Sequence, residues 1–273
     1  MPATELRSGD RGDNVRTAQE LMNRVGMLVD EDGVFGEGTE AAVRETQSIA
    51  RLAITGNVDD ATWAWLRAQP EPSPDIATKA VVFIVKEEVG GRAYYETHAA
   101  RPTYPGGQSG ITIGVGYDLR FQTAERFAAD WEAVLTRIQL ESLMPFIGRQ
   151  GSDDAARGLV ALTIPWRSAW TVFIRRILPR YVAETRGAFQ GFDQLTRLSR
   201  GVLVSLVYNR GVKMDGDNRK EMREIRDAVR AGEVEVIPDA ILSMKRLWPD
   251  SNSLRQRRDR EAALFREGLR TGA

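Results

Sequence analysis

Residues 106–118 read Gly-Gly-Gln-Ser-Gly-Ile-Thr-Ile-Gly-Val-Gly-Tyr-Asp. Ile111 and Ile113 alternate with Thr112, which predicts a short strand with the isoleucines on one face and the threonine on the other. The glycines permit tight turns and allow another chain to approach the backbone closely. We therefore expect a β-hairpin that carries Thr112 and Asp118.

The segment before this stretch predicts a helix that ends in two glutamates. Residues 76–89 are apolar on nearly all sides, and Gly90-Gly91 supplies a C-terminal stop. Glu87 and Glu88 lie at the helix end, where the macrodipole and partial burial both favour the protonated form of a carboxyl group. A general acid needs that form at neutral pH. Periodicity alone does not choose between Glu87 and Glu88.

Composition narrows the chemistry that the chain can support. The 273 residues have a hydrophobic content of 42% and a formal net charge of zero, so nothing in the bulk charge indicates a nucleic-acid partner. The absence of cysteine excludes disulfides, thiolate zinc sites and a cysteine nucleophile. One histidine, His98, is too few for most catalytic zinc sites. Carboxylate chemistry remains, and we expect neither a metal nor another cofactor.

Hydropathy predicts no membrane-targeting segment. Residues 1–16 lack the apolar centre of a signal peptide, and no apolar run reaches the roughly 18–20 residues that span a bilayer. We expect synthesis in a cytoplasm without a signal peptide, no stable membrane insertion, and a monomer.

A proline-rich segment and an internal repeat divide the chain. Residues 70–75 hold three prolines in six positions, which favours an extended linker. Upstream, residues 15–19 and 43–47 are similar in sequence and predict two helices with similar faces. Thr39 is expected to cap the second helix, and Asp59 or Asp60 a third helix over residues 61–68. The predicted domains are therefore 1–69 and 76–273, joined by 70–75.

Downstream of residue 76 the chain is predicted to be mostly helical. Together with the hairpin this gives an α+β fold. The expected helices cover residues 77–89, 123–135, 166–189, 199–208, 220–231 and 253–269.

The first domain resembles the peptidoglycan-binding domain type 1. The resemblance covers about residues 5–69 and rests on the pattern Leu6-x-x-Gly9, Val15-x-x-x-Gln19, Asp32-Gly33-x-Phe35-Gly36-x-x-Thr39, Ala42-Val43-x-x-x-Gln47 and Thr62-Trp63. It implies a three-helix module that holds an enzyme on the cell wall. The wall-binding residues are expected near the turn, at Asp32, Gly33, Phe35, Gly36 and Thr39, with Phe35 filling the core.

The second domain resembles the phage-type lysozyme superfamily, and most closely its pesticin-like branch. In that resemblance the helix-end glutamate, the Thr of Thr-Ile-Gly and the Asp of Gly-Tyr-Asp carry catalysis, which implies Glu88, Thr112 and Asp118. Many phage lysozymes place the second acid before the Thr-Ile-Gly strand, so Glu87 with Glu96 is the alternative layout.

The same resemblance implies further substrate contacts. Gly114, Gly116 and Tyr117 of the hairpin are expected at the sugar chain, together with Tyr208 and Asn209 at the end of an apolar helix. Residues 255–262 resemble the closing helix of the family, whose arginines are expected to form salt bridges on a solvated face.

These resemblances imply an endolysin that acts on peptidoglycan. The expected reaction is hydrolysis, with inversion, of the β-1,4 bond between N-acetylmuramic acid and N-acetylglucosamine. The alternatives are a lytic transglycosylase on the same bond and a non-catalytic wall-binding protein. The protein is expected to act in the periplasm or cell wall after release from the host cytoplasm.

Overall fold

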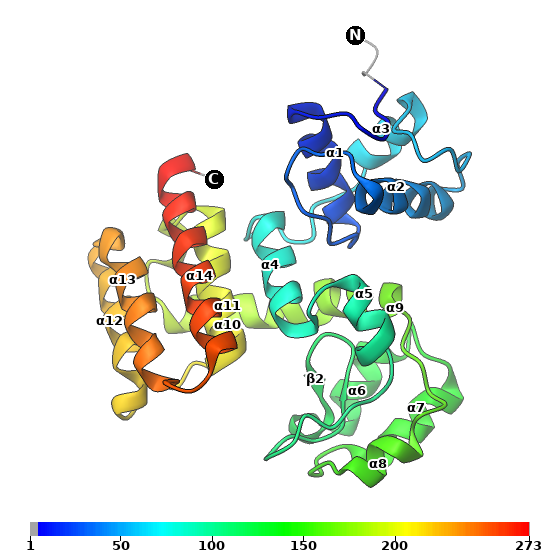
Figure 1. Ribbon diagram of the computed structural model, residues 1–273. Helices are drawn as coiled ribbons and strands as arrows, with labels where there is room; N and C mark the ends of the chain where they lie inside the picture. The colour runs from blue at the N-terminus through cyan, green and yellow to red at the C-terminus, as the bar shows by residue number, and fades with distance from the viewer. Residues whose placement is uncertain (1–4, 273) are drawn as a thin grey trace. The chain divides into compact units, whose positions relative to one another are not determined.

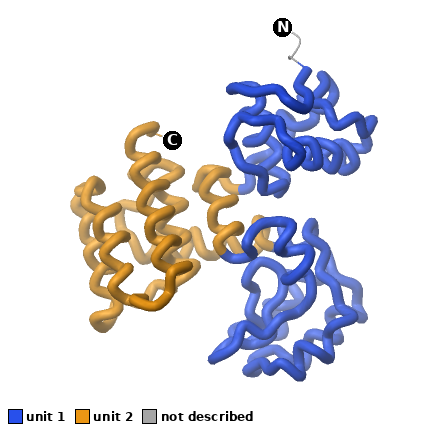
Figure 2. The backbone as a smooth tube through the Cα atoms, in the orientation of Figure 1, with its two compact units in different colours: residues 1–72, 88–172 blue, residues 73–87, 173–273 orange. Residues whose placement is uncertain are grey.

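The computed structural model describes residues 5–272, and the chain forms two compact units (Figure 2). The first contains residues 1–72 and 88–172, and the second contains residues 73–87 and 173–273. One boundary, between Pro72 and Ser73, falls inside the predicted linker. The predicted domains 1–69 and 76–273 stay a prediction, and residues 1–4 of the first lie outside the described part.

The first unit begins with a three-helix module (Figure 1). Its helices are α1 (Asp13–Arg24), α2 (Glu37–Ala50) and α3 (Asp60–Arg67). They enclose a small core to which Phe35 and Trp63 contribute, with exposed fractions of 1% and 3%. Phe35 therefore packs inside the module, as expected for a core residue.

A buried glutamine holds the loop between α1 and α2. The Gln19 side-chain amide donates to Asp32 Oδ1 at 2.9 Å, to the Val34 carbonyl at 3.1 Å and to Thr39 Oγ1 at 3.1 Å. Its Oε1 accepts the backbone N–H of Gly33 at 2.9 Å. One side chain thus satisfies the polar groups of the whole turn.

The same arrangement recurs between α2 and α3. The Gln47 amide donates to Thr55 Oγ1 at 3.1 Å, to the Asn57 carbonyl at 2.8 Å and to Thr62 Oγ1 at 3.1 Å, and its Oε1 accepts the Gly56 N–H at 3.0 Å. The repeat that begins at residues 15–19 and 43–47 therefore extends through both following loops, bond for bond.

The helix starts of the module follow two different patterns. Asp59 caps α3, because its carboxylate accepts the Thr62 N–H at 2.8 Å. The cap predicted at Thr39 is wrong: Gly36 occupies the N-cap position of α2, and Thr39 lies inside the helix with its hydroxyl held by Gln19. The Thr39 hydroxyl accepts a hydrogen bond from Gln19, and not from a backbone N–H at the start of the helix.

The remainder of the first unit surrounds a small hairpin. It contains α5 (Arg92–Tyr94), a π-helix η1 (Tyr95–Ala99), strands β1 (Thr112–Ile113) and β2 (Tyr117–Asp118), and α6 (Ala124–Trp131). Three further helices follow, α7 (Arg137–Leu143), α8 (Asp153–Gly158) and α9 (Trp166–Val172). The predicted hairpin is confirmed, whereas the helix expected over 123–135 ends at Trp131.

The second unit is all helical in its described part. It contains most of α4 (Thr78–Val89), the π-helix η4 (Phe173–Ile177), α10 (Leu178–Ala188), α11 (Arg197–Arg210), α12 (Lys220–Ala231), α13 (Ile237–Ser243) and α14 (Asn252–Thr271). Helices α11 and α14 lie side by side (Figure 1). The predicted helices 77–89, 199–208, 220–231 and 253–269 are confirmed to within a few residues at each end.

A buried ionic cluster joins α11 to α14. Glu261 and Arg258 are fully buried, and Arg258 Nε lies 2.9 Å from Glu261 Oε2. Ser205 donates to Glu261 Oε1 at 2.6 Å, and Arg257 Nε does so at 3.3 Å. The solvated face expected for the arginines of this segment is therefore wrong for Arg257 and Arg258, which form their salt bridges in the interior, whereas Arg260 is exposed.

Among residues 5–272, no helix combines the length and apolar character needed to cross a membrane.

The glutamine contacts predict a matched pair of stability effects. Gln47→Leu leaves the buried Gly56 N–H without its acceptor and removes the amide that donates to the Asn57 carbonyl and Thr62 Oγ1. An unsatisfied buried group costs about 1–3 kcal/mol. We expect Gln19→Leu and Gln47→Leu to lower the opening free energy of α1–α3 amide protons by roughly 2–4 kcal/mol in native-state hydrogen exchange. Gln150→Leu, at an exposed position of the same unit, is the control. Unchanged protection in Gln47→Leu would contradict this account.

Candidate functional site

The hairpin places Thr112 directly opposite Asp118. The two strands pair antiparallel, with Thr112 across from Asp118 and Ile113 across from Tyr117. Thr103 adds a bridge on the outer side of Thr112, with N···O distances of 3.0 and 2.8 Å. Directly opposed side chains of an antiparallel pair lie on one face, about 4.5–5.5 Å apart at Cβ. The threonine hydroxyl and the aspartate carboxylate therefore share a face of the hairpin.

Backbone N–H groups fix the Asp118 carboxylate. Asp118 Oδ1 accepts from the Gly110 N–H at 2.9 Å and from the Arg120 N–H at 2.8 Å, and Oδ2 lies 3.1 Å from the Gly110 nitrogen. The side chain is half-buried. This carboxylate is held in one orientation, and it also closes the loop that precedes β1.

Glu88 lies at the end of α4 and in the same unit as the hairpin. The helix stops at Val89, and Gly90 and Gly91 follow with φ of 67° and 99°, which glycine adopts readily. The Glu88 side chain is half-buried. The Glu88 side chain is therefore only partly accessible from the surface.

Glu87, the neighbouring acid, is occupied by an ion pair within the second unit. Arg260 of α14 donates to its two carboxylate oxygens at 2.6 and 2.9 Å, and the Glu87 side chain is only 11% exposed. A bidentate pair of this kind engages both oxygens of the carboxylate. The bond to Glu87 correspondingly raises the pKa of Arg260. Both carboxylate oxygens of Glu87 are thus bound by Arg260 and are not free to address a leaving group.

Glu96, the alternative second acid, belongs to the π-helix. It accepts from Arg92 Nε at 3.0 Å, and about half of its side chain is exposed. Arg92 also contacts Glu45 of the three-helix module at 2.5 Å. Glu96 is therefore one of two carboxylates that share one guanidinium.

Three hairpin residues predicted at the substrate have different environments. Tyr117 is 4% exposed, and its hydroxyl donates to Asp130 Oδ2 at 2.9 Å. Gly114 is buried at φ 58°, and a Cβ there would lie 2.7 Å from the Trp131 ring. Only Gly116 is exposed. Tyr117 and Gly114 thus have packing roles that alternation alone did not reveal, and their contact with substrate stays a prediction.

Tyr208 and Asn209 lie in the second unit, at the end of α11. Tyr208 packs against Tyr181 and Phe173 with ring centroids 4.3 and 6.0 Å apart. Asn209 Oδ1 accepts from Arg258 at 3.1 Å. The amide is thus linked to the buried Glu261 cluster, and a substrate role for both residues stays a prediction.

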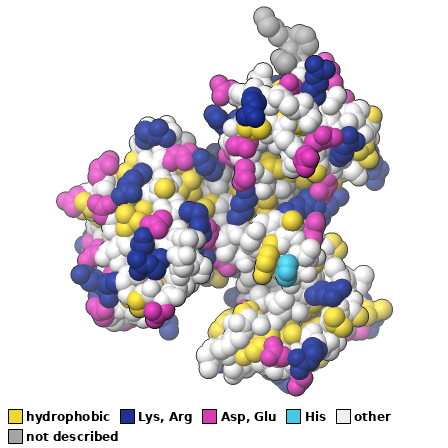
Figure 3. All heavy atoms as spheres, viewed as in Figure 1, with side chains coloured by type: hydrophobic (Ala, Val, Ile, Leu, Met, Phe, Trp, Pro, Cys, Tyr) yellow, Lys and Arg dark blue, Asp and Glu magenta, His cyan; other side chains and the backbone are white. Residues whose placement is uncertain are grey.

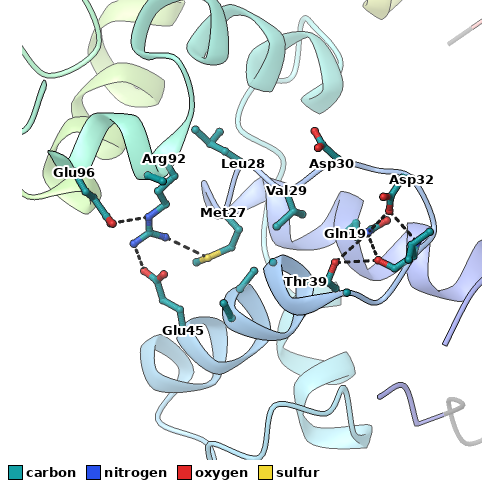
Figure 4. Close-up of a pocket in the computed structure, with 16 residues that line it drawn as sticks. Gln19, Met27, Leu28, Val29, Asp30, Asp32, Thr39, Glu45, Arg92 and Glu96 are labelled. Carbon is teal, nitrogen blue, oxygen red and sulfur yellow. Dashed lines mark hydrogen bonds and ion pairs between the residues drawn. The ribbon is translucent and has the colours of Figure 1, made fainter. Parts of the chain in front are cut away.

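The predicted wall-binding turn borders a cavity of about 540 Å³ (Figure 4). Asp32, Gly36 and Thr39 line it, whereas Gly33 and Phe35 do not. Met27, Leu28 and Val29 add apolar surface. Arg92 lies at one side of this cavity, with dashed contacts to Glu45, Glu96 and Met27 in Figure 4. The volume lies in the range of pockets that hold small ligands.

Asp32 carries a negative charge at this cavity. Its carboxylate accepts from the Gln19 amide and from the Val34 N–H at 2.8 Å. These bonds, the Gln19 bond first, lower the pKa of Asp32. The carboxylate therefore stays ionised at neutral pH.

Residues 11–66 match the family model described as a putative peptidoglycan binding domain. This match covers the three-helix module and the turn that borders the cavity. No curated protein matches the chain. A crystal structure of the Burkholderia AP3 phage endolysin is similar, with 16% identity over 99% of this chain and 100% of that chain, at a TM-score of 0.24. A TM-score of this size supports no conclusion about fold or function.

The packing of Gly114 against Trp131 predicts an asymmetric pair of glycine substitutions. Gly107 has nearly the same φ, 59°, but nothing lies within 4 Å of its Cβ position. We expect Gly107→Ala to cost about 1–2 kcal/mol from backbone strain alone. Gly114→Ala should cost roughly 1–3 kcal/mol more, because it also displaces the Trp131 ring. Urea unfolding of the full chain would measure both, and equal losses would contradict a packing role for Gly114.

Proposed function

We propose that the chain is a modular endolysin that hydrolyses the β-1,4 bond between N-acetylmuramic acid and N-acetylglucosamine in peptidoglycan. The observation that carries the proposal is the pairing of Thr112 with Asp118 on one face of a hairpin. The family match of residues 11–66 supports peptidoglycan as the polymer. In this proposal residues 1–69 bind the wall, 70–75 link, and 76–273 form a lysozyme-like domain of the pesticin-like branch.

The proposed reaction uses Glu88 as the acid and Asp118 as the base. Glu88 gives its proton to the glycosidic oxygen as the bond to the anomeric carbon breaks. Asp118 takes a proton from a water that attacks the same carbon from the opposite side, and the Thr112 hydroxyl orients this water. The reaction leaves Glu88 ionised and Asp118 protonated, and exchange with solvent restores both.

The Arg260 ion pair supports Glu88 over Glu87 as the acid. Both carboxylate oxygens of Glu87 bind Arg260 in the second unit, whereas Glu88 belongs to the unit that contains the hairpin. The fixed orientation of the Asp118 carboxylate suits a base that must address one water molecule. The predicted place of action, the periplasm or cell wall after release, belongs to the same proposal.

The contacts of Asp118 also favour a second candidate. If the bonds to Gly110 and Arg120 are the whole role of this carboxylate, Glu88 acts alone, as in a lytic transglycosylase. Glu88 then gives its proton to the glycosidic oxygen as that bond breaks, the muramic acid hydroxyl attacks the anomeric carbon, and Glu88 takes the proton of that hydroxyl. A 1,6-anhydro product forms without water.

Clearing of purified peptidoglycan tests the acid. We expect Glu88→Gln to lose roughly 100-fold or more of the clearing rate, because it removes the proton donor. Glu87→Gln, the matched neighbour, should stay within a few-fold of wild type. The proposal fails if Glu88→Gln clears as fast as wild type, and activity lost only in Glu87→Gln and Glu96→Gln would select the alternative layout.

Product mass and Asp118→Asn test the reaction type. Hydrolysis adds one water to each cleaved bond, and transglycosylation adds none. Asparagine keeps an oxygen that can accept the Gly110 and Arg120 N–H groups but cannot take a proton from water. We expect hydrated products from wild type and a roughly 100-fold slower Asp118→Asn. Anhydro products with an active Asp118→Asn would establish the second candidate instead.

A further inference from the structure

Two aromatic rings are stacked at the surface beside the end of α4. The rings of Tyr94 and His98 have centroids 4.2 Å apart and an interplanar angle of 14°. Tyr94 is 53% exposed, and His98 is also exposed. Figure 3 shows the single histidine of the chain, in cyan, at the molecular surface. We propose that this stacked pair is a binding platform for one sugar ring of the glycan strand, a proposal that rests on the proposed function.

Two large apolar rings are exposed in the described part of the first unit, Tyr94 at 53% and Phe121 at 66%. The neighbouring aromatic side chains are buried: Tyr95, Phe127 and Trp131 have exposed fractions of 0%. A large ring left in water forgoes the gain of burial, and exposed aromatic side chains are enriched where a ligand covers them. In the stack the inner faces of the two rings cover each other, so an outer face and the ring edges are what a ligand can contact.

The stacked pair is in contact with the turn that follows the proposed acid. A Cβ built at Gly90 would lie 3.1 Å from Tyr94 Cγ, so the Tyr94 ring rests on Gly90. Gly90 is two residues after Glu88. A sugar ring on this platform would therefore lie close to the end of α4 that carries the acid.

The backbone beneath the rings is held in place. Tyr95, one of the three residues between them in the chain, buries its ring and donates its hydroxyl to the Ile164 carbonyl at 2.9 Å. Arg92 ties the preceding turn to Glu45 and Glu96. Thr97 Oγ1 lies 2.6 Å from His98 Nδ1 and so fixes the imidazole. A platform ordered before binding loses little entropy when the ligand arrives.

The two rings meet because Tyr94 and His98 are four residues apart on a helical segment, a spacing that places side chains on one face. Residues Tyr95–Ala99 form a π-helix, a rare structure that occurs frequently at functional sites. Such a wide turn changes the register of the side chains that follow it. Here His98 stacks on Tyr94, and the Thr97 hydroxyl lies beside the imidazole.

A sugar ring fits these groups better than a purely apolar partner does. The face of an aromatic ring carries negative quadrupole charge, which attracts the polarised C–H groups of a pyranose face. The Tyr94 hydroxyl can hydrogen-bond sugar hydroxyl or N-acetyl groups at the rim. Aromatic surface with a few polar groups around it is typical of a ligand site.

The single histidine makes this platform directly observable. The probe is the β-1,4-linked N-acetylglucosamine tetramer, titrated into full-length Glu88→Gln so that it is not cleaved. We expect saturable shifts of the His98 imidazole C–H resonances in the NMR spectrum. Tyr94→Ala should weaken the binding roughly tenfold, and Tyr94→Trp, which keeps an aromatic face, should restore it. Ile138→Ala, which removes a 77% exposed apolar side chain of the same unit, is the control and should change nothing.

Several outcomes would overturn the platform. These are His98 signals that stay in place while the tetramer binds, an affinity unchanged in Tyr94→Ala, and no binding up to roughly 10 mM. In the active chain, Tyr94→Ala should raise KM more than it lowers kcat, and the reverse pattern would also contradict the proposal. Wild type that never clears peptidoglycan would refute the proposed function, while the tetramer titration would still decide whether the platform binds sugar.

Discussion

The shape of the hairpin depends on one carboxylate. Strands of two residues each are too short to be stable by themselves. The Asp118 side chain joins the Gly110 N–H, before β1, to the Arg120 N–H, after β2. Gly110 is suited to this contact, because a Cβ there would lie 2.6 Å from Asp118 Oδ1. Because Asp118 closes the hairpin, it also holds Thr112 directly opposite itself. Asp118 therefore serves both the local fold and the proposed chemistry.

A contact from a distant helix distinguishes two adjacent glutamates. Neighbouring helical residues point about 100° apart, so Glu87 and Glu88 cannot both face one partner. Arg260 of α14 takes Glu87, and this pair lies within the second unit. Glu88 is grouped with the first unit, which contains the hairpin. Helical periodicity could not make this distinction, because α4 is apolar on nearly all sides and its partner lies far away in the sequence.

Features with local causes were predictable from the sequence, and features with distant causes were not. The helix over 220–231 matches α12 at both ends, because its amphipathic pattern stops at Gly232, a left-handed residue. The hairpin followed from its glycines and alternating isoleucines. The π-helix, the burial of Tyr117 by Asp130 and the inward turn of Thr39 each depend on partners outside the local pattern. The exposed Tyr94 ring was missed for the same reason, although a second aromatic residue four positions from His98 was visible.

In the three-helix module, the side chains that fix the two loops are neutral, and the charge comes from a different residue. Gln19 and Gln47 make the same four bonds, so each loop has its shape from a neutral amide. The bonded partner differs at one position, Asp32 in the first loop and Thr55 in the second. The Asp32 carboxylate and the Thr55 hydroxyl each accept a hydrogen bond from their glutamine, but only Asp32 carries a charge. Because Asp32 lines the 540 Å³ cavity and Thr55 does not, the two copies of one fold differ in the ligands that they can attract.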